Sequence, residues 1–190
     1  GSQRLGGPHS EFRVRAMYQP PLEMRLGNPS RVHAIASEQA WAGCSRHPLL
    51  MRTSTRVYSS WAHLYEDRPD EALRSLRALE DEMRENGYLT HTVGRAGWML
   101  VLASCGLRLG RPDLCREAVR RFGRRRDALQ RCMGASVQAV CEIAEGRTIE
   151  ATATLEELRR VAHEAGNDTA EATACWTLGH LLPGPEGEPH

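Results

Sequence analysis

Lysine is absent from this chain of 190 residues, and all 25 of its basic side chains are arginine. Its 24 acidic side chains nearly balance them, so the net charge is +1. That balance provides no overall field to steer the protein toward nucleic acid or an anionic membrane. A phosphate-binding loop of the form G-x-x-x-x-G-K-[ST] is excluded, because it requires lysine. We interpret the exclusive use of arginine as codon bias of a GC-rich genome.

Long hydrophobic runs and closely paired cysteines are also missing. No stretch approaches the roughly 18 consecutive apolar residues that a membrane span needs. The six cysteines are spread along the chain without a C-x-x-C pair. Most lie among small or apolar residues, where cysteine packs as a small hydrophobe. We therefore expect buried, reduced thiols and a cytoplasmic protein with no membrane contact.

Motifs for catalysis and metal binding are absent. The eight histidines form no H-E-x-x-H motif and no paired spacing with cysteine. No G-x-S-x-G nucleophile elbow occurs either. Acidic stretches carry arginine three or four residues away, as in Arg77 and Asp81, which is typical of solvated helix faces. The sequence predicts no enzyme, no metal and no cofactor.

What the chain does contain is a recurring turn. It reads "RLGNPSRV" at 25–32, "YEDRPDEA" at 65–72, "RLGRPDLC" at 108–115 and "AEGRTIEA" at 144–151. Glycine, which adopts the left-handed cap conformation at little cost, stands where one helix ends in three of these blocks. The second block has Asp67 instead, so we expect that helix end to differ in detail. Proline near the start of the next helix costs no hydrogen bond; these prolines are Pro29, Pro69 and Pro112.

Apolar side chains follow each turn at spacings of three and four, which places them on one helix face. The expected stripes are Ala72, Leu73, Leu76, Leu79 and Met83, then Leu114, Cys115, Ala118, Val119 and Phe122, then Ile149, Leu155, Leu158, Val161 and Ala162. Partner helices are expected over 47–66, 88–109 and 128–145. Each carries a small residue 12 positions before the end of its block, at Ser60, Ala103 and Ala139. No long alternating run predicts a strand.

These blocks, above all "GRPDLCREAVRRF" and "DRPDEALRSLRAL", resemble the tetratricopeptide repeat over residues 25–182. The resemblance implies an all-α fold of about four antiparallel hairpins, stacked as a right-handed superhelix. Residues 1–24 would be a tag remnant followed by an extended or poorly formed lead-in, and 183–190 a flexible tail. The final "WTLGHLL" is similar to a first helix without its second. An open end of this kind would allow self-association.

Degenerate arrays of this type resemble the sensor arrays of bacterial ATP-binding LuxR-type activators and of the maltose-responsive regulator. The resemblance implies a non-catalytic module that senses a protein, a peptide or a small-molecule effector in a groove. Mapped onto this chain, the groove positions are Trp61, Tyr65, Ser104, Arg108, Met133 and Val140. The alternative is that Trp61 packs in the core between hairpins.

The strongest charge feature is "RRFGRRR", with Arg120, Arg121, Arg124, Arg125 and Arg126. Such a cluster can bind phosphates. It lies at an expected helix end, where arginine suits the helix dipole, and the flanking stretches 66–85 and 142–171 are acidic. This argues against nucleic acid. Two alternatives to the sensing module therefore stay open: a protein-assembly scaffold, and an arginine-rich nucleic-acid binder.

Overall fold

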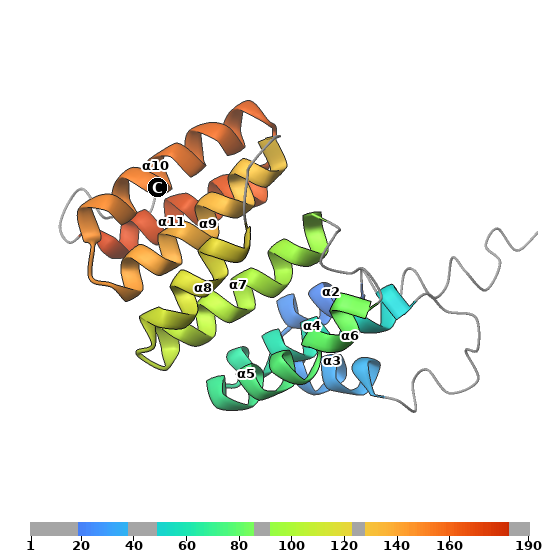
Figure 1. Ribbon diagram of the computed structural model, residues 1–190. Coiled ribbons are helices and arrows are strands. Elements are labelled where there is room, and N and C mark those ends of the chain that lie inside the picture. The colour runs from blue at the N-terminus through green and yellow to red at the C-terminus, as the bar shows by residue number, and fades with distance from the viewer. Residues whose placement is uncertain (1–18, 38–48, 86–91, 123–127, 183–190) are drawn as a thin grey trace, which may run out of the picture. The chain divides into compact units, whose positions relative to one another are not determined.

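The computed structural model in Figure 1 describes residues 19–37, 49–85, 92–122 and 128–182. Every regular element within these ranges is an α-helix, and they contain no strand. The predicted all-α class is therefore confirmed. The helices are α2 (Gln19–Arg25), α3 (Pro29–Ala36), α4 (Leu49–Tyr65), α5 (Pro69–Ala78), α6 (Glu80–Glu85), α7 (Thr92–Arg108), α8 (Pro112–Phe122), α9 (Ala128–Ala144), α10 (Thr148–Glu164) and α11 (Asp168–Leu181).

The chain divides into two compact units, Gly1–Val101 and Leu102–His190, with the boundary inside α7. In the first unit α3 packs against α4, and α4 packs in turn against α5. In the second unit α8 contacts α9, α9 contacts α10, and α10 contacts α11. Helices that follow one another in the sequence are therefore spatial neighbours within each unit (Figure 1).

Five turns between these helices share one backbone conformation. Each has a residue with positive φ: Gly27 (72°), Asp67 (57°), Gly110 (63°), Gly146 (70°) and Gly166 (63°). The amide of this residue donates to the carbonyl three residues earlier, and the next amide donates to the carbonyl five residues earlier. This hydrogen-bond pair defines the Schellman motif, which satisfies the last carbonyls of a helix.

The expectation that the second turn would differ was wrong for its backbone. The amide of Asp67 donates to the Leu64 carbonyl at 3.1 Å, and that of Arg68 donates to the His63 carbonyl at 2.8 Å. Aspartate is one of the few side chains that tolerate the left-handed region. The turn at Gly166, which joins α10 to α11, was not among the predicted blocks.

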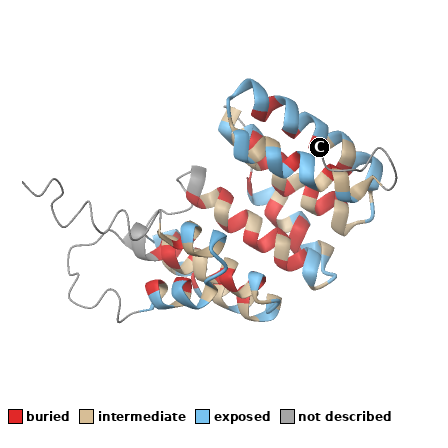
Figure 2. Ribbon diagram, turned by 180° about the vertical axis from the view of Figure 1, so that it is seen from behind, coloured by how far each residue is buried: buried red, intermediate tan, exposed pale blue. Residues whose placement is uncertain are grey.

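Twelve of the fifteen residues in the predicted apolar stripes are buried, and buried residues line the faces that helices turn toward their neighbours (Figure 2). Ser60, Ala103 and Ala139 are all buried, as the close approach of paired helices requires. One stripe residue was predicted wrongly: Ile149 is 85% exposed. It lies in the first turn of α10, before the helix reaches the core.

In the second unit α7 and α8 approach each other closely at Gly106. The Cys115 thiol donates to the Ala103 carbonyl at 3.3 Å. A β-carbon on Gly106 would lie 2.6 Å from Cys115 Sγ and 2.8 Å from the carbonyl oxygen of Arg111. Only glycine therefore fits at 106 without movement of α8.

Four of the five cysteines that the structure describes are buried. Cys105, Cys115, Cys132 and Cys141 are buried and free, as predicted, whereas Cys175 is exposed; Cys44 lies outside the described residues. Residues 1–18 of the expected lead-in and 183–190 of the expected tail also lie outside them, while Gln19–Arg25 forms α2, which contacts α3. Among the described helices, none combines the length and hydrophobicity needed to cross a bilayer.

Candidate functional site

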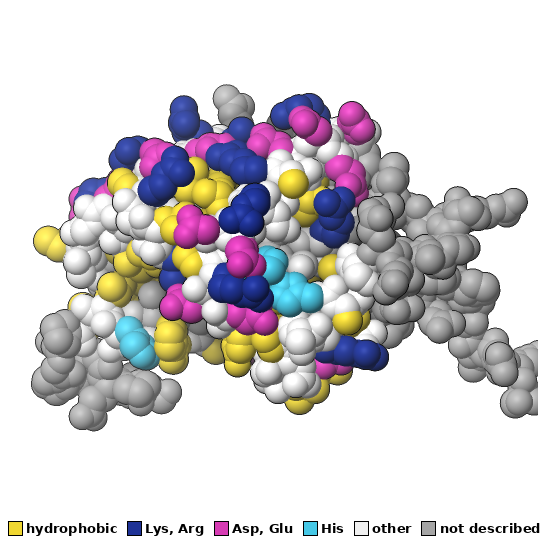
Figure 3. Space-filling view, turned by 90° about the horizontal axis from the view of Figure 1, so that it is seen from below, with side chains coloured by type: hydrophobic (Ala, Val, Ile, Leu, Met, Phe, Trp, Pro, Cys, Tyr) yellow, Lys and Arg dark blue, Asp and Glu magenta, His cyan; other side chains and the backbone are white. Residues whose placement is uncertain are grey.

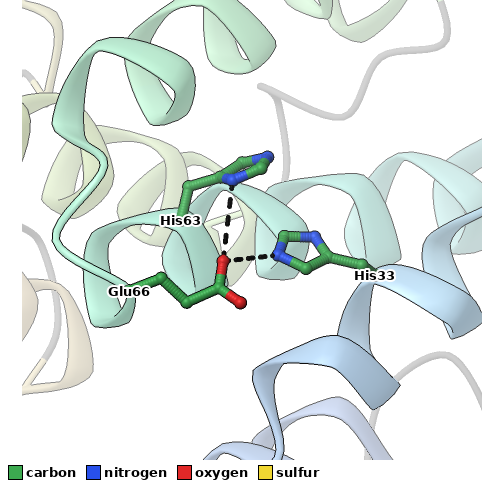
Figure 4. Close-up of side chains that lie close together, drawn as sticks. All are labelled: His33, His63 and Glu66. Atoms are coloured by element: carbon green, nitrogen blue, oxygen red, sulfur yellow. Dashed lines mark hydrogen bonds and ion pairs between the residues drawn. The ribbon is translucent and has the colours of Figure 1, made fainter.

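Two histidines from different helices and a glutamate from a turn lie close together in the first unit (Figure 4). His33 lies on α3, His63 on the last turn of α4, and Glu66 directly after α4. His33 Nε2 is 3.0 Å from Glu66 Oε2, and His63 Nδ1 is 3.9 Å from the same oxygen. The imidazole ring centroids are 4.4 Å apart. We call these three residues the His–His–Glu cluster.

The Schellman turn after α4 brings charged side chains to this cluster. Arg68 contacts Glu66 and donates to Glu71 Oε2 at 2.8 Å. Glu71, in the first turn of α5, places the same oxygen 3.4 Å from His63 Nδ1. The packing of α3 on α4 supplies His33. Two carboxylates and one guanidinium therefore surround the two imidazoles.

Each imidazole has a distinct environment. His33 Nδ1 lies 2.7 Å from Ser59 Oγ on α4, so both nitrogens of this ring have polar partners. His63 Nδ1 is buried and makes no hydrogen bond within the described part of the chain, although carboxylate oxygens lie nearby. In the space-filling view, histidine atoms reach the surface beside acidic and basic side chains (Figure 3).

Burial and charge set the protonation states of the cluster. Burial lowers the pKa of His63, and the neighbouring His33 and Arg68 lower it further. Burial raises the pKa of Glu66, but hydrogen bonds from Arg68 and His33 outweigh this effect, and the pKa is lowered overall. At neutral pH the cluster therefore presents a neutral His63 imidazole beside an ionised Glu66 carboxylate. Such groups can coordinate a cation or exchange a proton.

A second feature is a hollow of about 510 Å³ in the second unit, between α8 and α9. Its lining residues are Asp113, Arg116, Val119, Arg120, Gln138, Cys141, Glu145 and Arg147. We call it the α8–α9 hollow. It therefore combines three guanidinium groups with two carboxylates and an apolar wall.

Ion pairs hold one side of this hollow. Glu145 accepts from Arg116 at 2.6 Å and from Arg147 at 2.6 Å. Hydrogen bonds from Arg147 and then Arg116 lower the pKa of Glu145. Three residues earlier, on α9, Glu142 is only 6% exposed, and Gln138 donates to its Oε1 at 2.7 Å. Glu142 Oε2 makes no hydrogen bond within the described residues.

Arg120 differs from the other two arginines of the hollow. It is exposed on α8, and it has no ion-pair partner among the residues that the structure describes. Arg121 beside it pairs with Glu117 at 2.9 Å. The remaining predicted patch residues, Arg124, Arg125 and Arg126, lie outside the described residues.

The six predicted groove residues fall in both units. Trp61 and Tyr65 lie one turn apart on α4 in the first unit, where Trp61 is half-buried and Tyr65 is 58% exposed. The other four belong to the second unit: Ser104 and Arg108 on α7, and Met133 and Val140 on α9. Trp61 and Tyr65 are thus spaced by one helical turn on α4, and Ser104 and Arg108 are spaced in the same way on α7.

Neither the His–His–Glu cluster nor most of the hollow was among the predicted site residues. His33 and His63 come from separate blocks, so no local motif marks them. Arg120 was predicted as part of the arginine patch, and it is the residue that the patch shares with the hollow. No protein-family description, curated protein or solved structure matches the chain.

Proposed function

We propose that this chain is a non-catalytic binding module, the ligand- or protein-sensing helical-repeat domain of a bacterial transcriptional regulator. In this proposal the hairpins stack as a tetratricopeptide-like superhelix. The partner is a protein, a peptide or a small-molecule effector that carries an acidic group. The α8–α9 hollow receives this group, and it is the single observation on which the proposal depends.

Repetition of the turns supports the helical-array part of the proposal. Five turns use the same pair of backbone hydrogen bonds, and four of them place glycine at the left-handed position. Buried small residues recur opposite one another in the paired helices, as with Ala103 and Cys115. Arrays of such units offer extended surfaces for partners, and this is their usual function.

The composition of the hollow supports an acidic partner. Guanidinium groups bind carboxylates and phosphates through paired hydrogen bonds. Glu145 already engages Arg116 and Arg147, whereas Arg120 is available to an incoming anion. Val119 and Cys141 add apolar surface for the rest of the ligand. A volume of about 510 Å³ suits a side chain or a small effector.

Fluorescence anisotropy with two labelled peptides of equal length, one rich in glutamate and one rich in lysine, tests this proposal. The glutamate-rich peptide should bind, and Arg120→Ala should weaken it at least fivefold. Arg159→Ala is the matched control, because Arg159 is an exposed arginine on α10 that already pairs with Glu156. Equal binding of both peptides, or equal losses in the two variants, would contradict the proposal.

A protein-assembly scaffold is the second candidate, and exposed apolar side chains in the second unit favour it. Ile149 is 85% exposed and Trp176 is 61% exposed. Side chains of this size on a surface often mark contacts between proteins. Sedimentation velocity separates the candidates: a scaffold that self-associates through these residues should lose its larger species in the Ile149→Ser/Trp176→Ser double variant.

A further inference from the structure

The His–His–Glu cluster is a candidate binding site that is separate from the α8–α9 hollow. It does not depend on the function proposed for that hollow. We propose that His33 Nε2, His63 Nδ1 and a carboxylate oxygen of Glu66 bind a divalent transition-metal ion of the zinc class. One such atom from each residue lies within 4.8 Å of the others. The repeat architecture alone does not imply such a metal site in the first unit.

The ligand set indicates which ions fit. Two imidazole nitrogens and one carboxylate oxygen are a common set of protein ligands for Zn²⁺, with a fourth position left open. Imidazole also suits Co²⁺, Ni²⁺ and Cu²⁺. Ca²⁺ and Mg²⁺ prefer oxygen ligands throughout. The cluster is therefore expected to select transition metals over the alkaline-earth ions.

The distances are near those of a tetrahedral site. Metal–ligand bonds of about 2.0–2.2 Å place neighbouring ligand atoms roughly 3.4 Å apart. The two distances to Glu66 Oε2, 3.0 Å from His33 and 3.9 Å from His63, lie on either side of this value. The two histidine nitrogens lie at most 4.8 Å apart and must close by up to about 1.4 Å. Small side-chain rotations suffice, since both rings lie near the surface, with side chains 25% and 18% exposed.

Ser59 can hold His33 in either state. Without a metal, the serine hydroxyl donates to Nδ1 of His33, and the Nε2–H donates to Glu66; the spacings of 2.7 and 3.0 Å suit both bonds. With a metal on Nε2, the proton moves to Nδ1 and the serine oxygen accepts it, because a hydroxyl can donate or accept. Such outer contacts orient metal-binding histidines and are worth roughly 10- to 100-fold in affinity.

The environment of His63 also favours a bound cation. Its Nδ1 is buried without a hydrogen bond, which is costly for a polar atom. Oxygens of Glu71 and Glu66 lie 3.4 and 3.9 Å away. A cation between this nitrogen and these oxygens would satisfy all of them at once. Glu71 or a water molecule could then complete the coordination.

Arg68 is the competitor that this arrangement predicts. It contacts Glu66 and Glu71 together, so its guanidinium supplies the positive charge that the metal would otherwise provide. An ion that takes an oxygen of Glu66 must displace one of these contacts. Arg68 is 42% exposed and can turn toward solvent while keeping Glu71. Removal of Arg68 should therefore strengthen metal binding, whereas a purely structural ion-pair network predicts no such gain.

The test uses the full chain after chelation and dialysis. Isothermal titration with Zn²⁺ should give one site that is lost in the His33→Gln/His63→Gln double variant. Each single histidine variant should weaken binding at least tenfold, and Ser59→Ala should weaken it roughly tenfold without removing a ligand. Arg68→Ala should tighten binding at least threefold. Co²⁺ should produce the intense visible absorption of a four-coordinate site in the wild-type protein and not in the double variant.

His163→Gln is the matched control, because His163 also faces a glutamate, Glu171 at 3.2 Å, but has no second histidine nearby within the described residues. It should bind Zn²⁺ as the wild type does. Circular dichroism confirms that each variant is folded. Absence of Zn²⁺ binding in the wild type, or equal affinity of the wild type and the double variant, would overturn the proposal. So would weaker binding by folded Arg68→Ala.

Discussion

Replacing Gly106 by alanine should destabilise the protein, whereas the same change at Gly97 in the same helix should stabilise it. Both glycines lie on α7, and in an open helix interior alanine is favoured over glycine by about 1 kcal/mol. The main difference between the two positions is what a new methyl group would meet. At Gly97 the nearest atom is Val57 Cγ1 at 4.0 Å, an ordinary contact. The helical preference should therefore be realised there.

At Gly106 the same methyl group would clash with atoms of the neighbouring chain segment, including backbone atoms. Its β-carbon would lie 2.6 Å from Cys115 Sγ, 2.8 Å from the Arg111 carbonyl oxygen and 3.1 Å from the Cys115 amide nitrogen. Two of these are backbone atoms, so α8 itself must shift. Overpacking of this kind costs about 1–3 kcal/mol. After the helical gain of about 1 kcal/mol is subtracted, we expect a net loss of up to about 2 kcal/mol.

Urea unfolding followed by far-ultraviolet circular dichroism measures both changes. The unfolding midpoint should fall for Gly106→Ala and rise for Gly97→Ala. Adding Cys115→Ala to Gly106→Ala should recover only part of the loss, because the backbone contacts remain. If Gly106→Ala proves as stable as Gly97→Ala, the close approach of α7 and α8 is refuted.

Three further predictions follow from the turns, the ion pairs and the thiols. Gly146→Ala should cost about 1–2 kcal/mol in urea unfolding, because φ is 70° there and no neighbour interferes, and Gly146→Asp should cost less, since Asp67 tolerates the equivalent position. Because the pKa of Glu145 is lowered in the folded state, its stabilisation is present above the ordinary carboxyl pKa and is lost as the pH falls through the folded value; Glu145→Gln should flatten the acid side of a plot of melting temperature against pH. Burial raises the pKa of Cys115 to about 11, so at pH 8 Cys175→Ser should remove one fast-reacting thiol in a dithionitrobenzoate assay and Cys115→Ser should remove none.

Helix positions were predictable because the turns are marked by residues with strong local preferences. The expected helices over 47–66, 88–109 and 128–145 correspond to Leu49–Tyr65, Thr92–Arg108 and Ala128–Ala144. Glycine at the helix end and proline at the next start fix such limits. The turn at Gly166 lies outside the four predicted blocks, and no proline follows it. There the Asn167 side chain caps α11 instead, accepting a hydrogen bond from the Ala170 amide at 3.2 Å.

The His–His–Glu cluster could not be predicted in the same way. His33 and His63 are brought together by the packing register of α3 on α4, which no local pattern encodes. A rotation of either helix by one residue would separate the rings. His63 stands at the turn position that Gly106 fills in the next block, where its carbonyl accepts the closing hydrogen bond, and Glu23, Glu142 and Ala162 fill this position in the other turns. The residue type at this position therefore gave no signal of the cluster.

The shared conformation of the turns has a consequence for how the length of the chain can change in evolution. Because the turns at Gly110 and Gly146 share one hydrogen-bond geometry, the segment between them begins and ends at interchangeable connections. Deletion or duplication of that segment would leave the backbone of every remaining connection as it was. Genetic gain and loss of whole helix pairs is thus open to this molecule without the invention of a new loop.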